Sequence, residues 1–65
     1  MKLSPAQREA LALLKLADEP QTAKALQVNT RTLNILLSWG CVDAVVKPDA
    51  VYWRITERGR QEAAA

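Results

Sequence analysis

The segment PQTAKALQVNTRTLNILLSWGCV, residues 20–42, decides the fold of this chain. Its pattern predicts two helices joined by a tight turn, followed directly by a strand. We expect a short helix over residues 22–27 and a second helix over residues 30–39, capped by Asn29. Gly40 ends the second helix, because glycine readily adopts the left-handed conformation that closes helices. The segment therefore has the organisation of a helix-turn-helix motif.

The apolar positions of these helices predict which of their sides are buried. Ala25 and Leu26 form the buried side of the first helix. Leu33, Leu36 and Leu37 share one side of the second helix at positions i, i+3 and i+4, so we expect them in the core.

The distribution of charge over the motif is more informative than the net charge, which is only +2. No acidic residue occurs between Glu19 and Asp43, whereas Lys24 and Arg31 lie within that stretch. A helix-turn-helix without acids is suited to approach the phosphates and the major groove of DNA.

A helix over residues 4–18 is predicted ahead of the motif. Ser4 is a suitable N-cap, and Pro5 suits the first helical position. Leu11 and Leu16 widen the apolar stripe beyond an ordinary core-facing side. A small domain can use such a broad apolar helix for its core, or the two leucines can form a dimer contact; both interpretations stay open.

The period of the hydrophobic pattern changes after the motif. Alternating residues predict strands over residues 42–47 and 51–55, which a short turn joins into a hairpin. A last helix is expected over residues 57–64, with Thr56 as its cap. Gly59 near its start weakens that expectation, because glycine disfavours helix interiors.

The order of these elements, together with three short motifs, resembles the winged helix-turn-helix family of small bacterial and phage regulators. The motifs are T-x-x-x-L-x-V-N over residues 22–29, L-x-x-L-L-x-x-G-x-V over 33–42 and W-x-I-T-E-x-G-R over 53–60. The resemblance covers residues 3–60. It implies an α+β fold in a single domain, residues 1–65, with a three-helix core, a two-stranded β-hairpin wing and a short C-terminal helix.

The resemblance also implies a small sequence-specific protein that binds double-stranded DNA, a transcriptional regulator that reads the major groove with its third helix as a homodimer. Arg31 can donate two hydrogen bonds to a guanine, and Asn34 can pair with an adenine. Contacts to phosphate are expected from the start of the second helix and from the hairpin. The expected DNA-binding residues are Gln21, Thr22, Lys24, Asn29, Thr30, Arg31, Thr32, Asn34, Ser38, Lys47 and Arg54.

A protein–protein interaction module, such as a phage or bacterial accessory factor that binds little DNA, is the alternative. The low net charge favours it, and so does Asp49, an acid in the hairpin turn that would repel phosphate. In that case Ile35, Trp39 and Tyr52 are the expected anchors in a partner's pocket. Trp53 is expected in the core in either case.

Catalytic and metal-binding functions lack the residues that they need. The chain has no histidine and a single cysteine, Cys41, so the commonest general base and a zinc site are both missing. We expect no enzyme activity, no metal and no cofactor. No apolar run approaches the length of a membrane-spanning helix, about 18 residues or more. Since no secretory leader is recognisable either, a cytoplasmic protein is expected.

Overall fold

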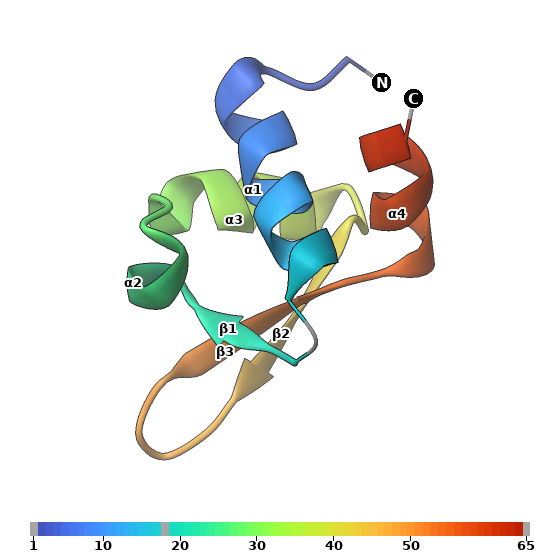
Figure 1. Ribbon diagram of the computed structural model, residues 1–65. Coiled ribbons are helices and arrows are strands. Elements are labelled where there is room, and N and C mark those ends of the chain that lie inside the picture. Colours follow the sequence, from blue (N-terminus) through green and yellow to red (C-terminus); the bar gives the residue numbers. More distant parts are fainter. Residues whose placement is uncertain (1, 18, 65) are drawn as a thin grey trace.

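The computed structural model describes residues 2–17 and 19–64, in which four helices accompany one three-stranded antiparallel sheet (Figure 1). The helices form one group, and the hairpin formed by residues 42–46 and 51–55 projects from it. This α+β arrangement is compatible with a winged helix-turn-helix. The elements in chain order are α1 (Pro5–Leu16), β1 (Gln21–Thr22), α2 (Ala23–Leu26), α3 (Thr30–Ser38), β2 (Val42–Val46), β3 (Val51–Ile55) and α4 (Glu57–Ala64).

Helix α1 begins with the cap that the sequence predicts. The Ser4 hydroxyl accepts a hydrogen bond from the Gln7 amide at 3.3 Å, and the Gln7 side chain accepts one from the Ser4 amide at 2.9 Å. The helix ends at Leu16, earlier than predicted, because Ala17 is extended and its N–H bonds back into the last turn. Residue 18, the expected end, lies outside the described residues, as do residues 1 and 65 at the ends of the expected domain.

Strand β1 is a finding that the sequence did not predict. Gln21 and Thr22 pair antiparallel with Trp53 and Tyr52 of β3. The predicted start of a helix at residue 22 is therefore wrong: Thr22 is extended and caps α2, accepting a hydrogen bond from the Ala25 amide at 3.0 Å. A strand of two residues is too short to show a periodic pattern in the sequence, and only its pairing with β3 identifies it.

Helix α2 is a single turn, shorter than the predicted 22–27. Gln27 follows it in the left-handed conformation, with φ 58°. Ala25 is exposed and Leu26 is only half-buried, so the predicted buried side was wrong for Ala25. One turn cannot bury a whole side; Val28, in the turn before α3, supplies additional packing against the core.

The core lies between α1, α3 and the sheet. Leu11 is completely buried, so it is a core residue and is not available for a dimer contact. Leu16, the other surplus leucine of α1, is 81% exposed. The buried apolar side chains are Leu3, Ala10, Leu11, Leu14, Leu33, Leu36, Cys41, Val42 and Trp53.

Helix α3 is rotated relative to the prediction from its leucines. Leu33 and Leu36 are completely buried, whereas Leu37 is 38% exposed. Ile35 and Trp39 are half-buried. The predicted placement of Leu37 in the core is therefore wrong, because the buried arc is centred near Leu36, with Leu33 on one side of it and Trp39 on the other. The helix also ends at Ser38, one residue before the predicted end.

The sheet has β3 in the middle, between β1 and β2. Ala44 pairs with Trp53 on the face toward the helices, and Asp43 pairs with Arg54 on the opposite face. Strand β2 ends at Val46 and not at the predicted residue 47, although the Lys47 amide still bonds to the Ala50 carbonyl at 3.0 Å.

The connection from α3 to β2 is a glycine turn. Gly40 has φ +75°, and its N–H donates to the Leu37 carbonyl at 3.0 Å. The Cys41 amide donates to the Leu36 carbonyl at the same distance. These two hydrogen bonds form a Schellman motif, which satisfies two of the last carbonyls of α3 and directs the chain into β2.

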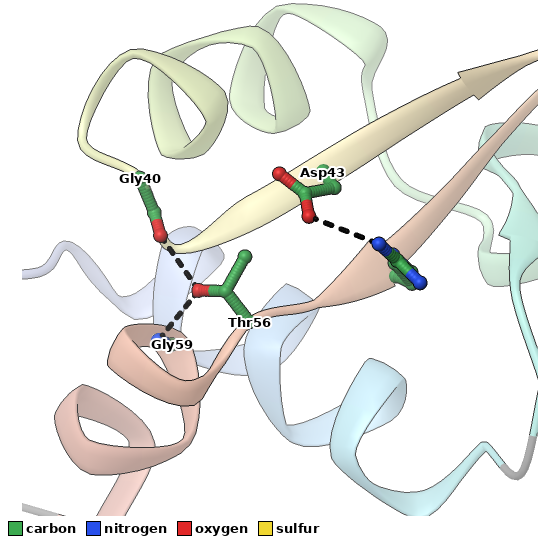
Figure 2. A network of polar contacts seen from close by, with 5 residues as sticks. Gly40, Asp43, Thr56 and Gly59 are labelled. Atoms are coloured by element: carbon green, nitrogen blue, oxygen red, sulfur yellow. Dashed lines mark hydrogen bonds and ion pairs between the residues drawn. The ribbon is translucent and has the colours of Figure 1, made fainter.

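Helix α4 returns to this turn (Figure 2). The Thr56 hydroxyl donates to the Gly40 carbonyl at 2.6 Å and accepts from the Gly59 amide at 3.0 Å. The Thr56 amide also donates to the Cys41 carbonyl at 3.0 Å. One threonine therefore caps α4 and fastens it to the end of α3.

Candidate nucleic-acid interface

The exposed side of α3 is a mainly polar stripe. Its members recur at the spacing of one helix face, and all of them are exposed. One of them is Leu37, which is predicted from its apolar spacing to lie in the core. Its position three residues after Asn34, on the same helix face, is the sequence feature that could have indicated its exposure. The stripe consists of Thr30, Arg31, Asn34, Leu37 and Ser38.

Arg31 and Asn34 are the side chains of this stripe best suited to an external partner. Among residues 2–17 and 19–64, neither side chain makes a hydrogen bond or an ion pair with another residue, and both are exposed. A guanidinium offers paired donors, and an amide offers one donor group and one acceptor. These are the groups that bind guanine and adenine edges in the major groove.

Two other predicted contacts are partly used within the protein. The Asn29 side-chain oxygen accepts a hydrogen bond from the Arg31 amide at 2.8 Å, which caps α3. The Ser38 hydroxyl donates to the Ile35 carbonyl at 2.6 Å. Ser38 therefore has no second proton to offer a phosphate, whereas Asn29 keeps its side-chain amide group.

Thr32 lies apart from the exposed stripe. It is half-buried and lines a small pocket together with Glu9 of α1 and Val28 of the turn. The structure thus brings Thr30, Arg31, Asn34 and Ser38 together on one face and turns Thr32 toward α1.

The residues around the start of α2 have mixed roles. The Thr22 hydroxyl is engaged as the cap of α2, and the Gln21 side chain donates to the Glu19 carbonyl at 3.3 Å. Lys24 is exposed, and no ion pair involving it is found in the described part of the chain. Lys24 is therefore the residue of this group with an ammonium available to a phosphate.

The tip of the hairpin holds one charge of each sign. The Lys47 ammonium lies over the Tyr52 ring, 4.9 Å from its centroid. The Tyr52 hydroxyl donates to the Asp49 carboxylate at 2.7 Å. This hydrogen bond lowers the pKa of Asp49 and raises the pKa of Tyr52. Asp49 is thus held beside Lys47 and offsets its charge.

Arg54 forms a surface ion pair with Asp43 across the two strands (Figure 2). The two charged groups are 3.4 Å apart, and the side chains are 60% and 51% exposed. Pairs as exposed as this contribute little to stability, so Arg54 can exchange its partner for a phosphate at small cost. Lys47 and Arg54 lie on the hairpin and not on the α3 stripe.

Cys41 offers no reactive group. It is completely buried, and burial followed by the nearby Glu62 raises the pKa of its thiol. A protonated, enclosed thiol is a poor nucleophile.

No protein-family model and no curated protein matches this chain. Solved structures do match, and among them that of a "putative DNA-binding protein" from Ralstonia eutropha JMP134 is similar over nearly the whole domain. It superposes with a TM-score of 0.73 at 26% identity and covers 97% of this chain and 95% of its own. Within the described residues, no helix combines the length and the apolar character needed to cross a membrane.

Proposed function

We propose that this chain is a winged helix-turn-helix protein that binds double-stranded DNA sequence-specifically, as a cytoplasmic transcriptional regulator. The observation that carries the proposal is the exposed stripe of α3, where Arg31 and Asn34 are without partners in the described chain and no acid occurs. The full-length similarity to the Ralstonia eutropha protein supports DNA as the partner. No catalytic role is proposed, since the chain lacks histidine and its one thiol is buried.

The stripe suggests how bases are read. Arg31, in the first turn of α3, donates to a guanine, and Asn34, one turn later, pairs with an adenine. Leu37 continues the line and offers an apolar surface to a thymine methyl group. Lys24, Lys47 and the other predicted contacts outside α3 supply sequence-independent binding to phosphate.

Pairing of two copies is part of the proposal. One α3 helix reads only a few base pairs, and a two-fold dimer doubles the site and requires a pseudo-palindromic target.

The alternative of a protein-docking surface has less support. Ile35 and Trp39 are half-buried, and Trp39 packs against the core. Tyr52 is half-buried and engaged with Asp49 and Lys47. Anchors of a docking surface are expected to project into solvent before the partner binds.

Fluorescence anisotropy on duplex DNA tests the proposal. The wild type should bind a mixed-sequence duplex and lose about tenfold or more of its affinity between about 50 and 200 mM salt. On a duplex selected for tight binding, Arg31→Ala and Asn34→Ala should each cost about 1–3 kcal/mol and relax the preference at one base pair.

Lys15→Ala is the matched control, because it removes one charge from an exposed position of α1. Its effect on affinity should be small. Absence of DNA binding by the wild type at about 50 mM salt would overturn the proposal, and so would equal losses for Lys15→Ala and Arg31→Ala.

A further inference from the structure

Strand β2 is one of the two outer strands of the sheet, and its hydrogen-bonding pattern shows which of its backbone groups face outward. The bonds from Thr56 to Cys41 and from Lys47 to Ala50 belong to the ladder between β2 and β3. Bonded positions alternate along an antiparallel pair, so residues 43 and 45 bond to β3. The N–H and C=O groups of residues 42, 44 and 46 therefore point away from the sheet.

This free edge is short and has defined ends. Val42 is completely buried, so its backbone is closed to another chain. Pro48, beyond the other end, has no N–H to donate. Ala44 and Val46 remain, half-buried and 78% exposed respectively, and within residues 2–17 and 19–64 their outward groups have no backbone partner.

The edge is complementary to itself in one register. If a second β2 runs antiparallel with Val45 at the two-fold axis, Ala44 of each copy lies opposite Val46 of the other. Both usable positions then form bonded pairs, and each such pair exchanges two hydrogen bonds. A register centred on Ala44 pairs that residue with itself and leaves Val46 opposite the buried Val42, so it forms fewer bonds.

The charges select the same register. With Val45 at the centre, Asp43 of each copy lies directly opposite Lys47 of the other, on the sheet face that also carries Arg54. Opposite charges in such cross-strand positions attract, whereas like charges repel. Asp43 already pairs with Arg54 at 3.4 Å, and Lys47 lies over Tyr52. The charged and aromatic side chains on this face would therefore continue from one copy to the other.

We propose that two copies of this chain pair antiparallel along β2, centred on Val45, and join their two three-stranded sheets into one. The inference rests on the dimer proposed above and assigns its surface, but it does not depend on contact with DNA. A closed two-fold pair uses up the free edge, which would otherwise remain open to uncontrolled strand pairing.

Sedimentation equilibrium without DNA tests this assignment. The wild type should dimerise with a dissociation constant below about 1 mM, a range that suits a small interface. D43K and K47D each place like charges at both cross-strand positions and should weaken dimerisation by about tenfold or more. A 1:1 mixture of these two variants should associate like the wild type, because each supplies the sign that the other lacks; the double variant D43K/K47D should also recover.

Amide hydrogen exchange gives an independent readout. The amides of Ala44 and Val46 should gain protection as the protein concentration rises, while those of Asp43 and Val45 are bonded to β3 throughout. Far-UV circular dichroism checks whether each variant is folded. Leu16→Lys is the control at an exposed apolar residue outside the hairpin and should leave the dimer unchanged.

A wild type that stays monomeric at about 1 mM would overturn the assignment and the dimer together. A dimer that survives D43K but is lost with Leu16→Lys would overturn the assignment alone. Neither result depends on DNA, so the anisotropy titration judges the proposed function separately.

Discussion

Gly59 of α4 packs directly against the backbone carbonyl of Cys41, and this contact leaves no room for a side chain. A Cβ at residue 59 would overlap the carbonyl oxygen and would lie 2.8 Å from the Cγ1 atom of Ile55. Gly59 is buried although it lies in a helix that is otherwise largely exposed. The glycine that weakens the sequence pattern of α4 is therefore the residue that allows the helix to dock.

Gly59→Ala should destabilise the fold in spite of the better helix propensity of alanine. Propensity alone would stabilise the helix by about 1 kcal/mol. The overlap with backbone atoms, which cannot rotate away, should cost more and lower the free energy of unfolding by about 1–3 kcal/mol. Urea denaturation measures the change. Gln61→Ala, at an exposed position of the same helix, should change stability by less than about 0.5 kcal/mol; a stabilised Gly59→Ala variant would contradict the close contact.

The Thr56 hydroxyl should matter more than its methyl group. Thr56→Val removes both the bond to the Gly40 carbonyl and the cap on the Gly59 amide, and should cost about 1–2 kcal/mol in the free energy of unfolding. Thr56→Ser keeps the hydroxyl and should retain most of that stability. Thermal and urea unfolding of the two variants side by side provide the measurement. Retained stability in Thr56→Val together with a loss in Thr56→Ser would assign the effect to packing of the methyl group instead.

The sequence predicted those elements whose signals are local. Ser4, Asn29 and Gly40 begin or end helices through their own side chains or conformations, and the structure has each in that role. Strand β1 was missed because its two residues are defined by pairing with β3. Gly59 was misjudged for the same reason, since its function is set by a carbonyl that is distant in sequence.

The candidate site was predictable in type but not in orientation. A leucine triplet on α3 suggested one buried side, whereas packing against α1 and β2 buried Leu33 and Leu36 and left Leu37 exposed. Periodicity gives the width of an apolar stripe to within about one residue, and only the partner elements fix its centre. In this orientation of α3, Ile35 is half-buried and Thr32 faces α1.

Leu36 and Leu37 form a matched pair that tests this orientation. Leu36→Ala removes a completely buried side chain and should cost about 2–5 kcal/mol in the free energy of unfolding. Leu37→Ala should cost about 1 kcal/mol or less, because the side chain is 38% exposed. The two values come from urea denaturation, and the folded Leu37→Ala variant can then be titrated with DNA. A loss for Leu37→Ala as large as that for Leu36→Ala would return Leu37 to the core.

The hydrogen bond between Tyr52 and Asp49 should give the hairpin tip a defined pH window. It lowers the pKa of Asp49, so its stabilisation is present above the usual pKa of an aspartate and is lost as the pH falls through the lowered value. It raises the pKa of Tyr52, so the stabilisation is present below the usual pKa of a tyrosine and is lost as the pH rises through the raised value.

Tyr52 is the only tyrosine of the chain, so phenolate absorbance during a pH titration reports on it alone. Asp49→Asn removes the negative charge that holds the phenol proton and should move the pKa of Tyr52 down toward its usual value. Asp43→Asn removes an equal charge from a carboxylate that pairs with Arg54 instead, and should leave the titration nearly unchanged. A Tyr52 titration that is the same in the wild type and in Asp49→Asn would show that the tip hydrogen bond does not persist in solution.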